Sequence, residues 1–112
     1  MKILISSQGQ NSDGPIDDRF GRCPWLIKYD TETNQIEALE NPGFRQSGGA
    51  GIAAAQFVID QAADVVISGD FGPHAARAFE ASDTKMCIFN GDISTVQQAV
   101  DSFLQGKLPV FQ

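Results

Sequence analysis

The sequence predicts a single α/β domain built on a mixed five-stranded sheet. In the second half of the chain, short apolar runs typical of strands alternate with segments of helical periodicity. In the first half, two strand-like runs flank a short polar turn, as in a hairpin. No linker, repeat or low-complexity tract divides the 112 residues, and a chain of this length buries roughly two thirds of its unfolded surface in one core. Residues 1–112 are therefore expected to form one domain.

The first three predicted strands form a meander. Residues 2–6 (KILIS) are a short apolar run that ends in small polar residues. Residues 25–30 (WLIKYD) form the second strand, and a turn at 31–34 leads into residues 35–40, where polar and apolar residues alternate as in a half-exposed strand. The polar loop at 7–22 is long for a compact domain, and such loops are usually functional or disordered.

Helices and strands then alternate. Residues 50–62 are apolar on most sides, which predicts a helix lying against the sheet. Residues 64–68 (DVVIS) form a β-branched run typical of a parallel strand buried on both faces. Pro73 suits the first position of a helix that extends to about residue 81. Residues 84–89 (TKMCIF) predict the fifth strand.

The last helix is predicted from its ends. Ser94 and Gln97 have the spacing of a capping box, and Gly106 closes the segment. The predicted order is β-β-β-α-β-α-β-α, a meander followed by two right-handed crossovers.

Composition excludes several classes of protein. The net charge of −6 argues against a nucleic-acid-binding surface, which needs clustered Lys and Arg. No run reaches the ~18 apolar residues of a membrane span, and MKILISS has neither the apolar core nor the cleavage site of a signal peptide. We expect a cytoplasmic protein whose two cysteines are free thiols.

The predicted topology brings several loops to one edge of the sheet. If the second strand alone is reversed, the loops at 7–22, 41–49, 69–72 and 90–93 follow the carboxyl ends of the other four strands, where open α/β sheets bind ligands. The residues expected at this edge are Arg19, Arg22, Arg45, Arg77, His74 and Cys23. The ordinary preference of arginine for loops is the alternative explanation.

Two glycine-rich turns precede helices at the same edge. Gly48, Gly49 and Gly51 begin the first helix, and Gly69 and Gly72 lead into the second. Glycine lets backbone N–H groups approach a ligand, and a helix N-terminus carries partial positive charge. The turns predict an anion-binding arrangement, with ordinary βα turns as the alternative.

The motif RFGRCPW, residues 19–25, points to soft-metal chemistry. Pro24 holds Cys23 extended. The flanking Arg19 and Arg22 are expected to lower the pKa of the thiol toward the thiolate, which ligates soft metals. Two aromatic side chains are expected to line the site, Phe20 and Trp25. The alternative is a cysteine that only packs.

Other polar residues near this edge have competing interpretations. His74 is either a second metal ligand, a donor to an anion or a solvated residue at a helix start. Asp17, Asp18 and Asp70 are expected to be solvated or paired with arginines rather than to form a hard-metal site. Cys87, in the middle of a strand, is expected in the core.

Together these motifs resemble the dinitrogenase iron-molybdenum cofactor biosynthesis family. The segments RFGRCPWL, NPGF…GGAGIAAAQ, DVVISGDFGPHAARAF and GDISTVQQAVDSFLQGKL carry the resemblance, which covers essentially the whole chain. It implies an RNase H-like α/β fold with strand order 3-2-1-4-5 and strand 2 antiparallel. The positions that match the family motifs are Arg19, Phe20, Gly21, Arg22, Cys23, Gly48, Gly49, Gly51, Gly69, Gly72 and Pro73.

The resemblance also implies a function. Members are cytoplasmic proteins that bind, carry or shield iron-sulfur or molybdenum-containing metal-sulfur clusters, some of them in nitrogenase cofactor biosynthesis and hence nitrogen fixation. We expect a non-enzymatic carrier in cofactor assembly or storage, whose partners are cluster donor and acceptor proteins. In this hypothesis Cys23 ligates a metal of an iron-sulfur or iron-molybdenum-type cluster. Arg19, Arg22 and either Arg45 or Arg77 then hydrogen-bond its sulfides.

Rival functions are weaker. A nuclease of this fold needs carboxylates on the first strand, and KILIS has none. A Cys23–His74 nucleophile pair lacks an identifiable orienting residue. The serious alternative is a metal-free module that binds a small anion or a protein partner at the same edge, for which Cys23 is dispensable. The oligomeric state is left open.

Overall fold

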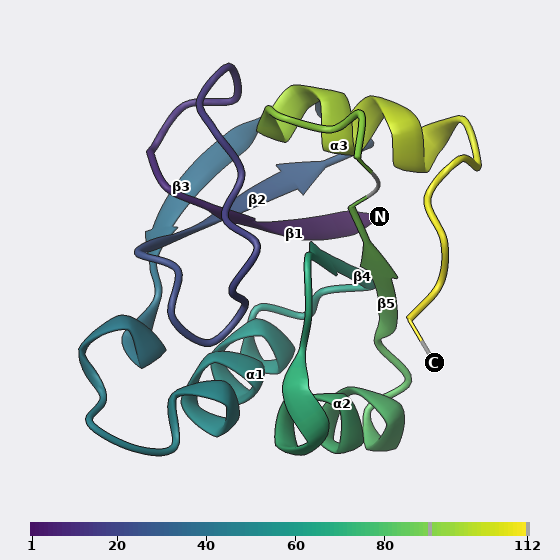
Figure 1. The fold of residues 1–112 in the computed structure, drawn as a ribbon. Helices are drawn as coiled ribbons and strands as arrows, with labels where there is room; N and C mark the ends of the chain where they lie inside the picture. Colours follow the sequence, from purple (N-terminus) through teal and green to yellow (C-terminus); the bar gives the residue numbers. More distant parts are fainter. Residues whose placement is uncertain (90, 112) are drawn as a thin grey trace.

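The computed structural model describes residues 1–89 and 91–111 and contains the predicted mixed sheet, with strand order β3-β2-β1-β4-β5. Helices α1 and α2 cover one face of the sheet and α3 covers the other (Figure 1). The strands are β1 (Lys2–Ser7), β2 (Trp25–Asp30), β3 (Ile36–Glu40), β4 (Val65–Ser68) and β5 (Lys85–Ile88). The helices are the 3₁₀ helix η1 (Pro42–Arg45), α1 (Ala50–Asp60), α2 (Gly72–Ala81) and α3 (Val96–Leu104).

Strand directions agree with the expected topology. β2 pairs antiparallel with both β1 and β3, whereas β4 pairs parallel with β1 and with β5. The carboxyl ends of β1, β3, β4 and β5 therefore lie at the same edge of the sheet. Residue 90, part of the loop predicted at 90–93, lies outside the described residues.

The sheet is buried on both faces, which explains the nearly continuous apolar runs of β1 and β4. Side chains alternate between two core clusters, one under α1 and α2 and the other under α3. In β1, for example, Leu4 faces the first cluster, while Ile3 and Ile5 face the second. Cys87 belongs to the second cluster and is 1% exposed, which confirms it as a core residue.

The start of α3 corrects the predicted capping box by one residue. The cap is Thr95, whose side chain accepts a hydrogen bond from the backbone of Gln98, and the Gln98 side chain in turn accepts from the Thr95 backbone. Ser94 and Gln97 have the spacing of a capping box too. However, Thr95 is still in extended conformation and bridges to Pro15, so the helix cannot begin before it. A tertiary contact therefore decides where the helix begins.

The long loop after β1 is fastened to the sheet rather than free. Its residues form isolated bridges between Ser7 and Ile16 and between Arg19 and Asp70, besides the bridge to Thr95. Inside the domain, the Ser6 hydroxyl donates to the backbone carbonyl of Asp17 at 2.5 Å. The loop is thus held at both of its ends.

Three segments touch through their backbones near the end of β3. A Cβ atom at Gly43, in η1, would lie 2.5 Å from the Gly21 carbonyl oxygen and 2.6 Å from that of Ala50. A Cβ atom at Gly21 would lie 3.0 Å from the backbone nitrogen of Gly51. Only residues without a side chain allow the RFGRCPW loop, η1 and the start of α1 to approach this closely.

The last described residues run along β5. The backbone nitrogen of Ile88 donates to the Pro109 carbonyl at 3.0 Å, and that of Phe111 donates to the Met86 carbonyl at 2.9 Å. The Phe111 ring packs on Phe71, with 5.2 Å between ring centroids. Among the described residues, no helix is long and apolar enough to cross a bilayer.

We predict that Gly43→Ala lowers the free energy of unfolding by about 2 kcal/mol, since the new methyl group has to push two backbone segments apart. Urea denaturation followed by circular dichroism measures the change. Gly48→Ala is the matched control, because a Cβ atom there meets nothing within 4 Å. Equal stability of the two variants would contradict the close contact.

Candidate functional site

A shallow groove of about 330 Å³ lies where α1 and α2 begin. We call it the glycine groove. It unites three segments: the RFGRCPW loop, the turn before α1 and the turn before α2. Its lining residues are Gly21, Arg22, Gly49, Ala50, Gly51, Ile52, Phe71, Gly72 and His74. Six residues that the sequence analysis singled out are therefore brought together: Gly21, Arg22, Gly49, Gly51, Gly72 and His74.

Both helices present unfilled N-termini to this groove. Neither α1 nor α2 has a side-chain cap or an acidic residue in its first turn. Gly49 and Gly72 both have φ of 72°, a left-handed conformation that favours glycine. The N–H groups of a helical first turn have no partner within the helix and carry partial positive charge. The groove is therefore a place where an anion finds several hydrogen-bond donors.

Two side chains add cationic or donor character. Arg22 is exposed, and its guanidinium donates to the backbone carbonyl of Gln46, which fixes the side chain against the turn before α1. His74 is exposed in the first turn of α2. Ile52 is 55% exposed and gives the groove an apolar border.

Arg19 lies at the expected edge, but its guanidinium is paired with a carboxylate of the protein, that of Asp17. Its side chain binds Asp17 through two contacts, Nη2 to Oδ2 at 2.9 Å and Nε to Oδ1 at 3.0 Å. Burial alone would raise the pKa of Asp17, which is 2% exposed, but the hydrogen bonds from Arg19 and its charge outweigh burial and lower that pKa. The predicted pairing of this carboxylate with an arginine is confirmed.

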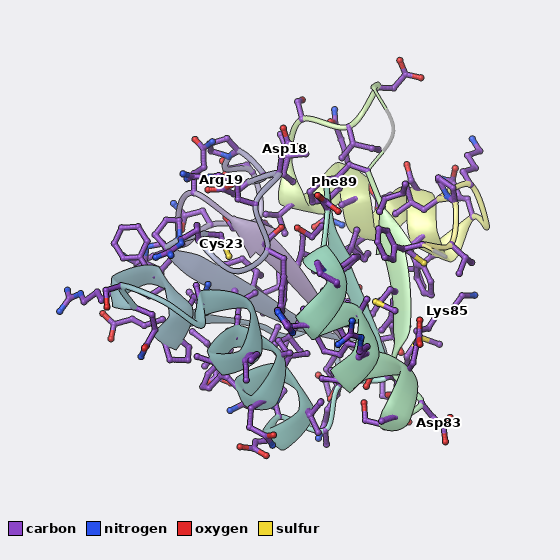
Figure 2. The ribbon with its side chains drawn as sticks, turned by 60° about the horizontal axis from the view of Figure 1, so that its bottom comes forward. Asp18, Arg19, Cys23, Asp83, Lys85 and Phe89 are labelled. Atoms are coloured by element: carbon purple, nitrogen blue, oxygen red, sulfur yellow. The ribbon has the colours of Figure 1, made fainter. Side chains whose placement is uncertain are left out.

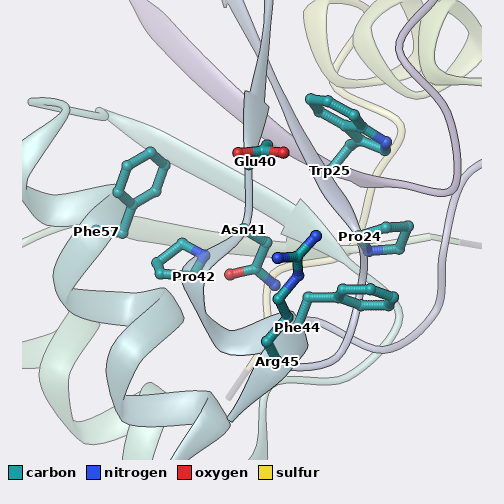
Figure 3. A pocket seen from close by; sticks show the side chains of 8 residues that line it. All are labelled: Pro24, Trp25, Glu40, Asn41, Pro42, Phe44, Arg45 and Phe57. Atoms are coloured by element: carbon teal, nitrogen blue, oxygen red, sulfur yellow. The ribbon is translucent and has the colours of Figure 1, made fainter.

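The structure places three other candidates outside the groove. Arg77, which was expected at this edge, lies in the middle of α2 and is not among the residues that line the groove. Gly48 is exposed and is not among the lining residues. Arg45 lies in η1 and lines a different pocket, together with Trp25 (Figure 3).

Cys23 contradicts the expected thiolate. Its side chain is 0% exposed, and Figure 2 shows its sulfur in the interior while Arg19 lies farther out. Burial raises the pKa of the thiol to about 12. The prediction that the neighbouring arginines lower this pKa is wrong, because Arg19 turns to Asp17 and Arg22 to Gln46. The Cys23 thiol donates to the Phe20 carbonyl at 3.2 Å.

Phe20 also belongs to the core rather than to a site lining. It is 1% exposed, and its ring lies 5.4 Å from that of Phe71 and 5.3 Å from that of Phe79. Within the described part of the chain, no three His, Cys, Asp or Glu side chains are grouped so that they could hold a metal ion. Ligation by Cys23 stays a prediction, and it requires the loop around Cys23 to open.

Asn41 organises this loop, although the sequence analysis did not single it out. The side chain is 3% exposed, and its amide donates to the Cys23 carbonyl at 2.8 Å and to the Cys23 sulfur at 3.4 Å. Its carbonyl oxygen accepts from the Gly43 backbone at 3.0 Å. The signal for this role was the Asn-Pro-Gly sequence directly after a strand, which favours a side-chain-stabilised turn.

Comparisons with known proteins agree with this architecture. A family model described as dinitrogenase iron-molybdenum cofactor matches residues 1–106. The apo form of the orange protein from Desulfovibrio gigas is 36% identical, with a TM-score of 0.90 over 98% of this chain and 92% of that one. A Thermotoga protein described as a candidate NifB protein of the DUF35 family is 29% identical, with a TM-score of 0.83 over 97% and 91%.

A more distant likeness supports the fold alone. A candidate dinitrogenase from Methanocaldococcus jannaschii is 16% identical, with a TM-score of 0.68 over 100% of this chain and 95% of that one. A search of curated proteins found no match.

We predict that Cys23 is unreactive in the folded protein. With a pKa of about 12 against an ordinary value of 9.0, alkylation by iodoacetamide at pH 8 should be about 10²–10³ times slower than in urea-unfolded protein. Cys87→Ala makes Cys23 the single thiol to follow by mass spectrometry. A rate within about tenfold of the unfolded one would show that the thiol is accessible.

The same pKa gives the sign of a stability effect. The contribution of the neutral Cys23 thiol to stability is complete below pH 9.0 and is lost as the pH rises toward 12. The free energy of unfolding should therefore fall more steeply above pH 9.0 in the native sequence than in Cys23→Ala.

Proposed function

Because the chain belongs to the dinitrogenase iron-molybdenum cofactor family, we propose that it is a non-enzymatic carrier that holds an anionic metal-sulfur cluster in the glycine groove. The cluster is cargo, received from one protein and passed to another. Its class is iron-sulfur or molybdenum-containing, as the family description suggests. The site of action is the cytoplasm, as the composition leads us to expect.

One observation carries the proposal: two uncapped helix N-termini converge on the same groove. A metal-sulfur cluster exposes sulfide edges that accept hydrogen bonds, and its negative charge is favoured by helix N-termini. Arg22 and His74 add donors at the border of the groove. Such a site recognises the sulfide surface of a cluster without supplying ligands to its metals.

The mode of binding also suits a carrier. An electron-transfer cluster is usually locked by four cysteines, whereas the one cysteine near this groove is buried and neutral at ordinary pH. Hydrogen bonds from backbone donors hold an anion without a covalent bond, so the cargo can leave when an acceptor offers thiolates. The openness of the groove to solvent supports exchange of this kind.

A second candidate uses the same donors. Because the described residues contain no metal-ligand cluster, a small anion without metal would also fit the glycine groove. This candidate is the metal-free anion-binding module that the sequence left as the alternative function. It shares the groove with the carrier but takes up neither metal nor sulfide.

The carrier proposal predicts that Gly51→Asp weakens cargo binding while the fold is kept. A carboxylate in the first turn of α1 interacts favourably with the helix, and a Cβ atom at this position meets only the Ala75 Cβ, at 3.9 Å. The same carboxylate repels an anionic cluster, so we expect at least about a tenfold loss of affinity. Gly51→Asn is the matched neutral control.

The measurement is anaerobic reconstitution with ferrous iron and sulfide, with and without tetrathiomolybdate, followed by metal and sulfide analysis and absorption spectroscopy. Cys23→Ala should retain its visible bands. Loss of cluster in Cys23→Ala with normal uptake by Gly51→Asp would replace the groove by a cysteine-ligated site. A native protein that takes up no cluster would favour the metal-free module.

A further inference from the structure

A second pocket, of about 400 Å³, is shown in Figure 3 and is lined in part by η1. We call it the aromatic pocket. Gly43 of the same η1 packs against Gly21 and Ala50 of the glycine groove. The aromatic pocket is formed by the start of β2, the end of β3, η1 and one residue of α1. Its lining residues are Pro24, Trp25, Glu40, Asn41, Pro42, Phe44, Arg45 and Phe57. It shares no residue with the glycine groove, and its volume falls in the range of small-molecule sites, about 300–1,000 Å³.

The walls of the aromatic pocket suit a flat ring. Trp25, Phe44 and Phe57 come from three separate segments and surround the pocket together with two prolines. Phe44 is 48% exposed, so its ring is accessible to a bound ligand. Aromatic side chains attract a further ring through stacked or edge-on contacts.

Two opposite charges lie unpaired in this pocket. Figure 3 shows the Arg45 guanidinium pointing into it, toward the end where Glu40 lies. Within residues 1–89 and 91–111, neither side chain makes an ion pair or a side-chain hydrogen bond. The amide of Asn41 is already used within the protein. The free polar groups are therefore one cation and one carboxylate, set among aromatic rings.

We propose that the aromatic pocket binds an aromatic amino acid, either free or as the C-terminal residue of a peptide. Both sources offer the same three groups. The ring packs between the aromatic walls, the α-carboxylate pairs with Arg45, and the α-nitrogen donates to Glu40. A simple aromatic acid lacks the donor for Glu40, and an amidated residue lacks the carboxylate for Arg45.

The test uses Trp25, the one tryptophan in the chain. Its fluorescence, excited where phenylalanine does not absorb, and its single indole N–H resonance both report on the pocket. The probes are phenylalanine, Gly-Gly-Phe, phenylalaninamide and 3-phenylpropionate. We expect saturable changes with phenylalanine or Gly-Gly-Phe, and at least about tenfold weaker binding of the amide and of phenylpropionate.

Variants connect the signal to the pocket. Arg45→Gln should lower the affinity for phenylalanine and Gly-Gly-Phe by about tenfold or more. Arg77 is also exposed and lies on α2 outside the pocket, so Arg77→Gln should leave the affinity unchanged. Phe44→Ala should weaken the binding of phenylalanine and of Gly-Gly-Phe to the same extent. All three side chains are exposed, so these variants are expected to fold.

The outcomes separate the two sources. Tighter binding of Gly-Gly-Phe assigns the pocket to the C-terminus of a partner chain, and tighter binding of phenylalanine assigns it to the free amino acid. The proposal is overturned if neither probe moves the indole resonance up to about 10 mM. It is also overturned if Arg45→Gln and Arg77→Gln bind equally well.

Discussion

The arrangement of this protein around its candidate sites depends on one buried carboxamide. Asn41 directly follows β3 and binds two backbone groups, the carbonyl of Cys23 in the preceding loop and the N–H of Gly43 in η1. Buried polar groups of this kind are costly to leave unpaired, so the contacts fix the loop and η1 relative to each other. The contact between Gly43 and Gly21 then becomes possible. From this arrangement follow the inward position of Cys23, the outward position of Arg22 and the contact of η1 with residues of both the groove and the pocket.

The sequence contains enough information to predict the fold, because the information is local. β1 and β4 are apolar runs, and their parallel pairing follows from the helices between the strands. The start of α3 was predicted one residue early, since the bridge between Pro15 and Thr95 decides it and joins positions far apart in the chain. That the six groove residues lie close together was predicted from the strand order, because loops that follow the carboxyl ends of parallel strands meet at one edge of the sheet.

The chemistry of the candidate site was harder to predict. Neighbouring arginines suggested a Cys23 thiolate, but the direction of an arginine side chain depends on its partner. For Arg22 that partner is the carbonyl of Gln46, 24 residues away, and for Arg19 it is the buried Asp17. The aromatic pocket could not be predicted from the sequence, because Trp25, Phe44 and Phe57 come from segments that only the tertiary fold brings together.

The two edge strands of the sheet, β5 and β3, differ in what covers them. β5 is covered by the chain that returns along it, through the hydrogen bonds of Ile88 and Phe111. β3 is the other edge strand, and Glu37 and Glu40 lie along it. Charged residues on an edge strand discourage its pairing with another chain. Among the described residues, β3 is therefore the edge strand that no other segment covers, and it lies next to the aromatic pocket. Two copies that paired through β3 would bring their carboxylates together.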